Sequence, residues 1–97
     1  MTRIELAELG DFLGTRFLGE LVRKKIDESL DHGDLVEVSF TNVSGITHSF
    51  ADEAFGAVLS ERGVEVFRKS VRLVDLSPDI RSVIRFVFSE RLHRHSQ

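Results

Sequence analysis

The chain has 97 residues, 41% of them hydrophobic and 30% charged, which suffices for one small domain with one modest core. Its net charge of −3 gives no general attraction to nucleic acid or to an anionic membrane. The absence of cysteine excludes disulfides, thiolate metal sites and cysteine nucleophiles, and the eight Phe, with no Tyr or Trp, are expected to be packing material. The N-terminus has no apolar signal-peptide segment and no apolar run approaches the roughly 18 residues of a membrane span, so a cytoplasmic protein is expected.

The N-terminal third of the sequence predicts a strand followed by a helix. Residues 3–9 alternate apolar and polar side chains, a pattern typical of a strand. Apolar residues then recur at helical spacing over residues 13–30. Either Asp11 or Thr15 is expected to cap the start of this helix, and Gly33 to end it.

The middle of the chain predicts a second strand and a second helix. Residues 34–43 give the clearest strand, because alternate apolar residues share one face. A helix is expected from Ser49 to Gly63, with an apolar stripe broad enough to bury most of it. Gly56 within it costs about 1 kcal/mol relative to Ala, which suggests close packing of this helix against a strand.

The C-terminal part predicts a third strand and a third helix. Residues 64–70 are ambiguous, because their β-branched side chains favour a strand while their apolar spacing suits a helical turn. Residues 71–76 read as a strand. Ser77 and Pro78 are a typical helix start, and residues 93–97 are expected to form a frayed tail. The order strand, helix, strand, helix, strand, helix predicts a single α/β domain over residues 1–97, with a largely parallel sheet and helices packed on it.

This topology places three helix starts beside the carboxyl ends of the strands. Thr15 and Arg16, His48 and Ser49, and Ser77 are therefore expected along one edge of the sheet, where open α/β sheets bind ligands.

Other side chains give no sign of catalysis, of a metal or of a cofactor. His93 and His95 are read as solvated, because no third ligand lies near them in sequence. His48 and Ser49 are adjacent, which rarely presents a base to a nucleophile, and no orienting acid is identifiable. The basic clusters lack interleaved exposed aromatic residues, so no nucleic-acid surface is expected. Phe86 lies off the buried stripe of the last helix, so it is either an oligomer interface, such as a homodimer, or is covered by a second layer.

One segment resembles a known family. The sequence VEVSFTNVSGITHSFADEAFGAVL is similar to the strand–loop–helix core of STAS-like domains of the DUF4325 type, which are related to anti-sigma-factor antagonists. The segments GTRFLGELV and VRLVDLSPDIRSVIRFV are similar to the first helix and to the last strand and helix of that family.

The resemblance implies a bacterial, non-enzymatic regulator that needs no cofactor and binds a partner protein, either a histidine-kinase-like ATPase or an anti-sigma factor. Ser49 matches the position that a partner kinase phosphorylates in true antagonists. The chain departs from that pattern, because His48 replaces an acidic residue before the serine and Ser39 fills an acidic position of the strand. The expected partner-binding edge consists of Ser49 with Thr15, Arg16, Thr47, His48, Phe50, Asp52 and Glu53.

Ser49 has two competing interpretations. Ser49 and Asp52 stand at S-x-x-D spacing, and a serine helix cap contributes about 1 kcal/mol. A phosphate would instead add a charge of about −1.5 to −2, which Asp52 and Glu53 would repel and Arg16 would offset. The alternative to a protein partner is a nucleotide or small ligand at the same edge.

Overall fold

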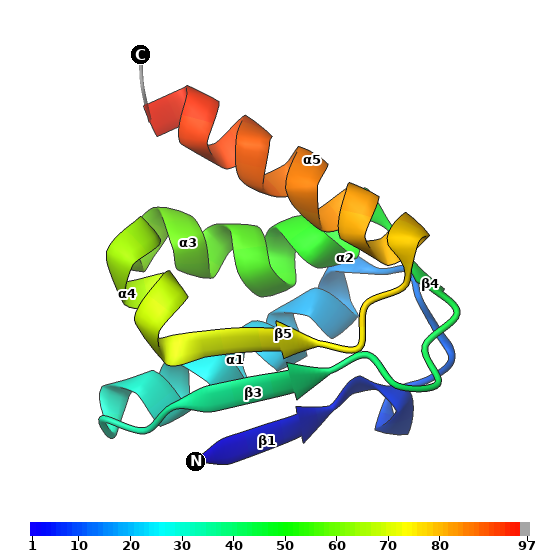
Figure 1. Ribbon diagram of the computed structural model, residues 1–97, viewed down its shortest axis with the longest axis horizontal. Helices are drawn as coiled ribbons and strands as arrows, with labels where there is room; N and C mark the ends of the chain where they lie inside the picture. Colours follow the sequence, from blue (N-terminus) through cyan, green and yellow to red (C-terminus); the bar gives the residue numbers. More distant parts are fainter. Residues whose placement is uncertain (96–97) are drawn as a thin grey trace.

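The structure, a computed structural model, describes residues 1–95. Its main sheet has three parallel strands, β1 (Thr2–Glu5), β3 (Val36–Ser39) and β5 (Val71–Val74), in the order β1-β3-β5 (Figure 1). A second, two-stranded parallel sheet pairs β2 (Phe12–Leu13) with β4 (Gly45–Ile46). The predicted α/β fold with a largely parallel sheet is confirmed, and the small sheet is an addition that the sequence did not predict.

Helices connect the strands. A 3-10 turn, η1 (Leu6–Glu8), follows β1, and α1 (Arg16–Asp31) precedes β3. Between β4 and β5 runs a continuous helical segment of three parts: α2 (His48–Ala51), the π-helical turn η2 (Asp52–Gly56) and α3 (Ala57–Arg62). The short helix α4 (Val64–Ser70) leads into β5, and α5 (Pro78–His95) ends the described chain.

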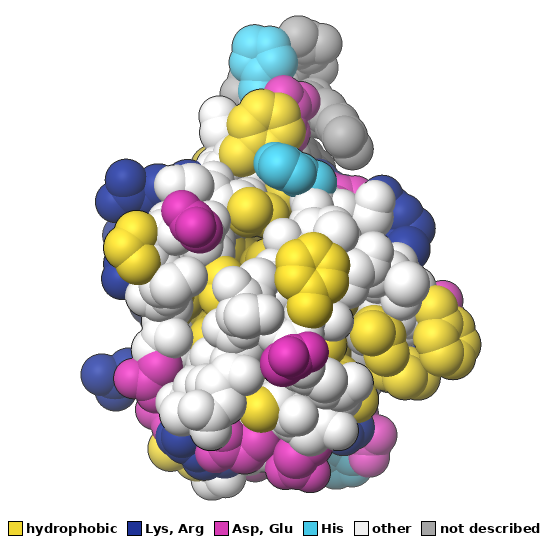
Figure 2. Space-filling view, turned by 90° about the vertical axis from the view of Figure 1, so that its right-hand side faces the viewer, with side chains coloured by type: hydrophobic (Ala, Val, Ile, Leu, Met, Phe, Trp, Pro, Cys, Tyr) yellow, Lys and Arg dark blue, Asp and Glu magenta, His cyan; other side chains and the backbone are white. Residues whose placement is uncertain are grey.

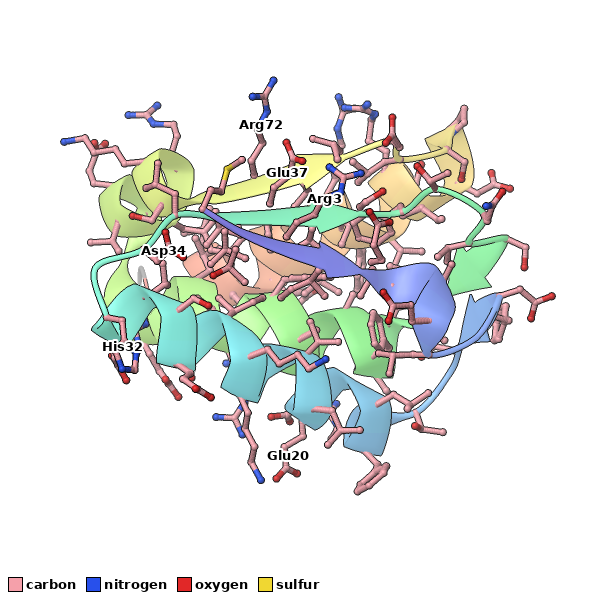
Figure 3. The ribbon with its side chains drawn as sticks, turned by 90° about the horizontal axis from the view of Figure 1, so that it is seen from below. Arg3, Glu20, His32, Asp34, Glu37 and Arg72 are labelled. Carbon is pink, nitrogen blue, oxygen red and sulfur yellow. The ribbon has the colours of Figure 1, made fainter. Side chains whose placement is uncertain are left out.

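The helices cover one face of the main sheet. Alternate strand residues Ile4, Val36 and Val38 are buried beneath them. The register places Arg3, Glu37 and Arg72 side by side on the other face, where all three point away from the helices (Figure 3). The sheet is therefore apolar on one side and charged on the other.

Several predicted boundaries were too wide. The first strand was predicted over residues 3–9, but it ends at Glu5 because η1 turns the fully buried Leu6 into the core. The strand predicted over residues 34–43 covers only β3, because the chain turns at Asn42, whose φ is 66°.

The ambiguous residues 64–70 are helical. Gly63, with φ 91°, breaks the helix before them, and Phe67 alone in this segment is buried. The last helix continues through His95, so residues 93–95 of the expected frayed tail are helical, and residues 96–97 lie outside the described part. No helix in the described residues is long and apolar enough to cross a membrane.

The core does not contain every aromatic ring. Phe40, Phe50 and Phe55 are fully buried, and the ring of Phe55 contacts those of Phe40 and Phe50. Three other rings are exposed: Phe12, Phe17 and Phe86 are 57%, 68% and 54% exposed. The prediction that the phenylalanines are packing material was wrong for Phe12 and Phe17. Phe86 was expected off the buried stripe of the last helix, and no second layer of the described chain covers it.

Glycines set how closely the helices approach. A Cβ at Gly19 of α1 would lie 2.7 Å from the Phe50 carbonyl oxygen, so α1 crosses the α2–η2 segment in direct backbone contact. Gly56 was predicted to pack against a strand, which was wrong. It faces α5 instead, where an added Cβ would lie 3.0 Å from Val87.

Candidate functional site

The starts of three helices gather at the edge where the main strands end. In Figure 1 the arrowheads of β3 and β5 point toward the side of the molecule where α2 and α5 begin and where β4 lies. The start of α1 joins them, because Thr47 Oγ1, before α2, donates a hydrogen bond of 3.1 Å to the Gly14 carbonyl oxygen, before α1. The sequence therefore predicted the location of this edge correctly.

Two threonines cap the helix starts at this edge. Thr15 Oγ1 accepts a hydrogen bond of 3.1 Å from the Leu18 amide, which decides between Asp11 and Thr15 as the cap of α1. Thr47 Oγ1 accepts one of 3.1 Å from the Phe50 amide. Ser49 lies two residues after this cap and its side chain is exposed, so the interpretation of Ser49 as the helix cap was wrong.

Ser49 lies in a shallow hollow of about 190 Å³ between α2 and α5. The ring of Phe86 meets the ring of His48 edge-on, with centroids 4.9 Å apart. The Ser49 site and the Phe86 surface, treated separately from the sequence, thus form one feature, here called the Ser49 hollow. It is lined by Arg16, His48, Ser49, Asp52, Phe86, Val87 and Glu90.

Three exposed rings lie on segments that meet at this edge of the sheet. Phe86 lines the Ser49 hollow, and Phe17 directly follows Arg16 in the first turn of α1. The ring of Phe12 covers Gly14 and Gly45, near the Thr47 cap of α2. A Cβ added at Gly14 would lie 3.2 Å from the Phe12 ring and 3.6 Å from Thr47. Figure 2, which faces this side of the molecule, shows hydrophobic side chains standing exposed among polar ones. The edge thus combines a hydroxyl, charges and apolar rings.

Asp52 is the electrostatic centre of the hollow. Arg91 of α5 binds it with both ends of its guanidinium group, from Nε to Oδ1 at 2.7 Å and from Nη2 to Oδ2 at 3.0 Å. Arg16 of α1 adds a contact of 3.1 Å. The hydrogen bond from Arg91 lowers the pKa of Asp52, and Arg16 lowers it further, against the opposing effect of partial burial.

The position of Arg16 at a helix start is explained by its acidic partners. Arg16 lies in the first turn of α1, where the helix dipole disfavours a cation. Its charge is compensated by Asp52 and by Glu53, at 3.4 Å, and the hydrogen bond to Asp52 raises the Arg16 pKa. Glu53 is held in turn by Arg23 at 2.9 Å.

The π-helical turn coincides with this charge cluster. Asp52 and Glu53 are its first two residues, and such turns often mark functional positions within helices. A π-helical turn contains one residue more than an α-helical turn, which rotates the side chains that follow it about the helix axis. At the start of this turn, Asp52 contacts Arg91 of α5 and Arg16 of α1, and Glu53 contacts Arg23 of α1.

Not every predicted edge residue reaches the surface. Phe50 is fully buried in the core, so its place in the predicted partner-binding set was wrong. Ser39, at the departure from the family's acidic position, is also fully buried. Its hydroxyl donates to Thr41 Oγ1 at 3.0 Å, and Thr41 donates to Asp75 at 2.9 Å. Thr41 thus links the Ser39 hydroxyl to a carboxylate in the loop after β5.

Comparison with known families places the chain. A family model described as "STAS-like domain of unknown function (DUF4325)" matches residues 18–81, about two thirds of the sequence. The chain belongs to this family. No curated protein and no solved structure matches it.

The matched part of this STAS-like domain supplies only one side of the Ser49 hollow. His48, Ser49 and Asp52 lie within residues 18–81. Arg16, Phe86 and Arg91 lie outside them, on the first turn of α1 and on the later turns of α5. Sequence reasoning missed Arg91, because nothing local relates it to a carboxylate 39 residues earlier.

Proposed function

We propose that this STAS-like domain is a non-enzymatic regulator that binds a partner protein through the Ser49 hollow and the exposed rings of the same sheet edge. The observation that carries the proposal is the position of Ser49: an exposed hydroxyl beside Phe86 and Arg16 in one hollow. Interfaces combine exposed aromatic residues with arginine in this way. By analogy with anti-sigma-factor antagonists, the partner is a histidine-kinase-like ATPase or an anti-sigma factor.

Phosphorylation of Ser49 is the proposed control. A phosphate would add a charge of about −1.5 to −2 beside Asp52 and would compete with it for Arg16. The start of the helix would also favour the phosphate, because the helix dipole places partial positive charge there. The result is a charge-dependent change at the docking surface.

The size of the hollow favours a protein over a nucleotide. Small-molecule sites are typically concave spaces of about 300–1,000 Å³ that enclose most of the ligand. The Ser49 hollow has about 190 Å³ and is shallow. Among the described side chains no hydrogen bond joins His48 to Ser49, and the His48 ring is engaged with Phe86. This supports a docking role for Ser49 over that of an activated nucleophile.

The test uses the full chain as bait in a lysate of its own cells. Wild type, Ser49→Ala and Ser49→Asp are compared, and retained proteins are identified by mass spectrometry. A partner held by wild type and Ser49→Ala but released by Ser49→Asp is the expected result. Lys25→Gln changes the net charge by the same amount on the exposed face of α1 and is expected to retain the partner.

Two results would contradict the proposal. If the same partner stays on all folded baits, the interface lies elsewhere on the domain. If no partner is retained and a nucleotide raises the melting temperature of wild type, the hollow serves a small ligand instead. Light scattering on the purified chain tests the alternative that Phe86 forms a homodimer interface. Phe86→Ala would dissociate such a homodimer.

A further inference from the structure

The strand β5 has a free edge. The Phe40 amide donates to the Val74 carbonyl oxygen at 3.0 Å, so Val74, and Arg72 two residues before it, direct their main-chain groups toward β3. Leu73 lies between them and directs its N–H and C=O away from β3. No strand pairs with that side among residues 1–95. A free strand edge is a template for another extended segment.

An apolar groove of about 400 Å³ runs beside this edge, between α4 and α5. Seven of its nine lining residues are apolar, and the other two are Arg68 and Arg72. Val64 and Leu92, at its rim, are 44% and 41% exposed. The groove shares no lining residue with the Ser49 hollow, so the two surfaces are independent.

The rim of the groove is basic, although the whole chain is acidic. Residues 64–72 carry three cations, Arg68, Lys69 and Arg72, against one carboxylate, Glu65. Glu65 is already paired with Arg68 at 2.8 Å. Arg72 is exposed and points away from the helices, on the outer face of the sheet (Figure 3).

We propose that this groove binds an extended segment of a partner protein, in which apolar residues alternate with Asp or Glu, as a fourth strand beside β5. Successive side chains of such a strand point to opposite faces. One set enters the apolar groove on the helix side, where Leu73 points. The other set reaches the outer face beside Arg72, where carboxylates are complementary. Main-chain hydrogen bonds to Leu73 supply the rest of the binding energy.

The experiment selects phage-displayed random dodecapeptides on the folded wild-type chain after depletion on Arg72→Glu. Enriched peptides are expected to alternate apolar with acidic residues. A synthetic copy of the strongest binder is expected to shift the amide resonance of Leu73 and of its neighbours in β5. Its affinity is expected to fall about tenfold with Arg72→Glu, the sum of a lost attraction and a new repulsion.

Three controls make the result specific. Lys25→Glu makes the same change of net charge on α1, outside the groove, and binding is expected to match wild type. Val64→Gln alters only an exposed rim residue and is expected to weaken binding without unfolding the chain. A copy of the peptide with alternate amides N-methylated keeps every side chain but loses the main-chain donors, and is expected not to bind.

Four results of the peptide experiment would overturn the proposal. These are the absence of enrichment, enrichment of basic or non-alternating peptides, equal binding of the N-methylated copy, and resonance shifts that avoid β5. A concentration-dependent dimer that Val64→Gln dissociates would also overturn it, because the groove would then hold a second copy of the chain.

Discussion

Arg91 near the end of α5 and Asp52 in the π-helical turn form a two-point ion pair, with contacts of 2.7 and 3.0 Å. Both side chains are mostly buried, at 19% and 18% exposure. Because Arg16 holds the same carboxylate at 3.1 Å, Asp52 connects α1, η2 and α5. The geometry of the Ser49 hollow therefore depends on one carboxylate.

The first prediction concerns the pH dependence of this connection. The pKa of Asp52 is lower in the folded chain than the value of about 3.9 in the unfolded chain. Its contribution to the free energy of unfolding is therefore complete above that value and is lost as the pH falls through the lower folded pKa. Asp52→Asn is expected to cost about 2 kcal/mol at pH 7, and the difference from wild type should shrink at acidic pH.

Urea unfolding of both chains between pH 7 and pH 2 measures this difference. Arg91→Gln provides the matched test, since it removes the main cause of the low Asp52 pKa and should also lose its cost in acid. A difference between wild type and Asp52→Asn that stays constant to pH 2 would show that the ionised carboxylate does not stabilise the fold.

The second prediction concerns the crossing of α1 with the α2–η2 segment. A Cβ at Gly19 would lie 2.7 Å from a backbone oxygen of Phe50 and 2.9 Å from Glu53 Cβ, and backbone yields less easily than a side-chain end. Gly19→Ala is therefore expected to lower the free energy of unfolding by about 1–3 kcal/mol, despite the higher helix propensity of Ala.

Urea denaturation measures the effect of Gly19→Ala against Lys25→Ala, an exposed position on the same helix. The control is expected to stay within about 0.5 kcal/mol of wild type. If Gly19→Ala proves as stable as the control, the two helices do not cross this closely.

The third prediction separates the cap from the proposed switch. Thr47→Val keeps the shape of the side chain but removes the bond to the Phe50 amide and the donation to Gly14. It should cost about 1 kcal/mol, whereas Ser49→Ala should be neutral within about 0.5 kcal/mol. Urea denaturation measures the free energy of unfolding of both variants. A larger cost for Ser49→Ala than for Thr47→Val would show that Ser49 is the helix cap.

The sequence predicted those features whose signals are local. Alternation in β3, helical spacing in α1 and the Ser77–Pro78 start of α5 each depend on neighbouring residues, and the Ser77 hydroxyl does accept from the Ile80 amide at 3.2 Å. The gathering of the helix starts at one edge of the sheet was predicted from the topology alone. For the same reason Arg16 and Ser49 were correctly expected to lie near each other.

Features that depend on distant partners were not predicted. Thr47 and Ser49 are both acceptable caps by sequence, and only the pairing of β4 with β2, which ends at Ile46, fixes the start of the helix at His48. The pair Arg91–Asp52 and the contact between His48 and Phe86 join segments almost 40 residues apart. The hollow, a product of both contacts, was therefore not predictable as one unit.

The last prediction tests whether Gly56 belongs to the same unit as the ion pair. An added Cβ at Gly56 would lie 3.0 Å from Asp52 Oδ1 and 3.2 Å from Arg91 Nε. In wild type, Gly56→Ala should therefore cost about 1 kcal/mol or more, since it pushes against the pair. In the Asp52→Ala background the oxygen is gone and Arg91 can move, so the same change should be neutral or stabilising, as helix propensity favours Ala by about 1 kcal/mol.

A double-mutant cycle of Gly56→Ala and Asp52→Ala by urea unfolding measures this coupling, expected at about 1–2 kcal/mol. Equal costs in the two backgrounds would assign the close approach to Val87 alone, which lies 3.0 Å from the same added atom. A cost of Gly56→Ala that disappears in the Asp52→Ala background would mean that the glycine is required for the ion pair. The small residue at the end of the π-helical turn then lets α5 approach closely enough for Arg91 to reach Asp52 and for Phe86 to reach His48.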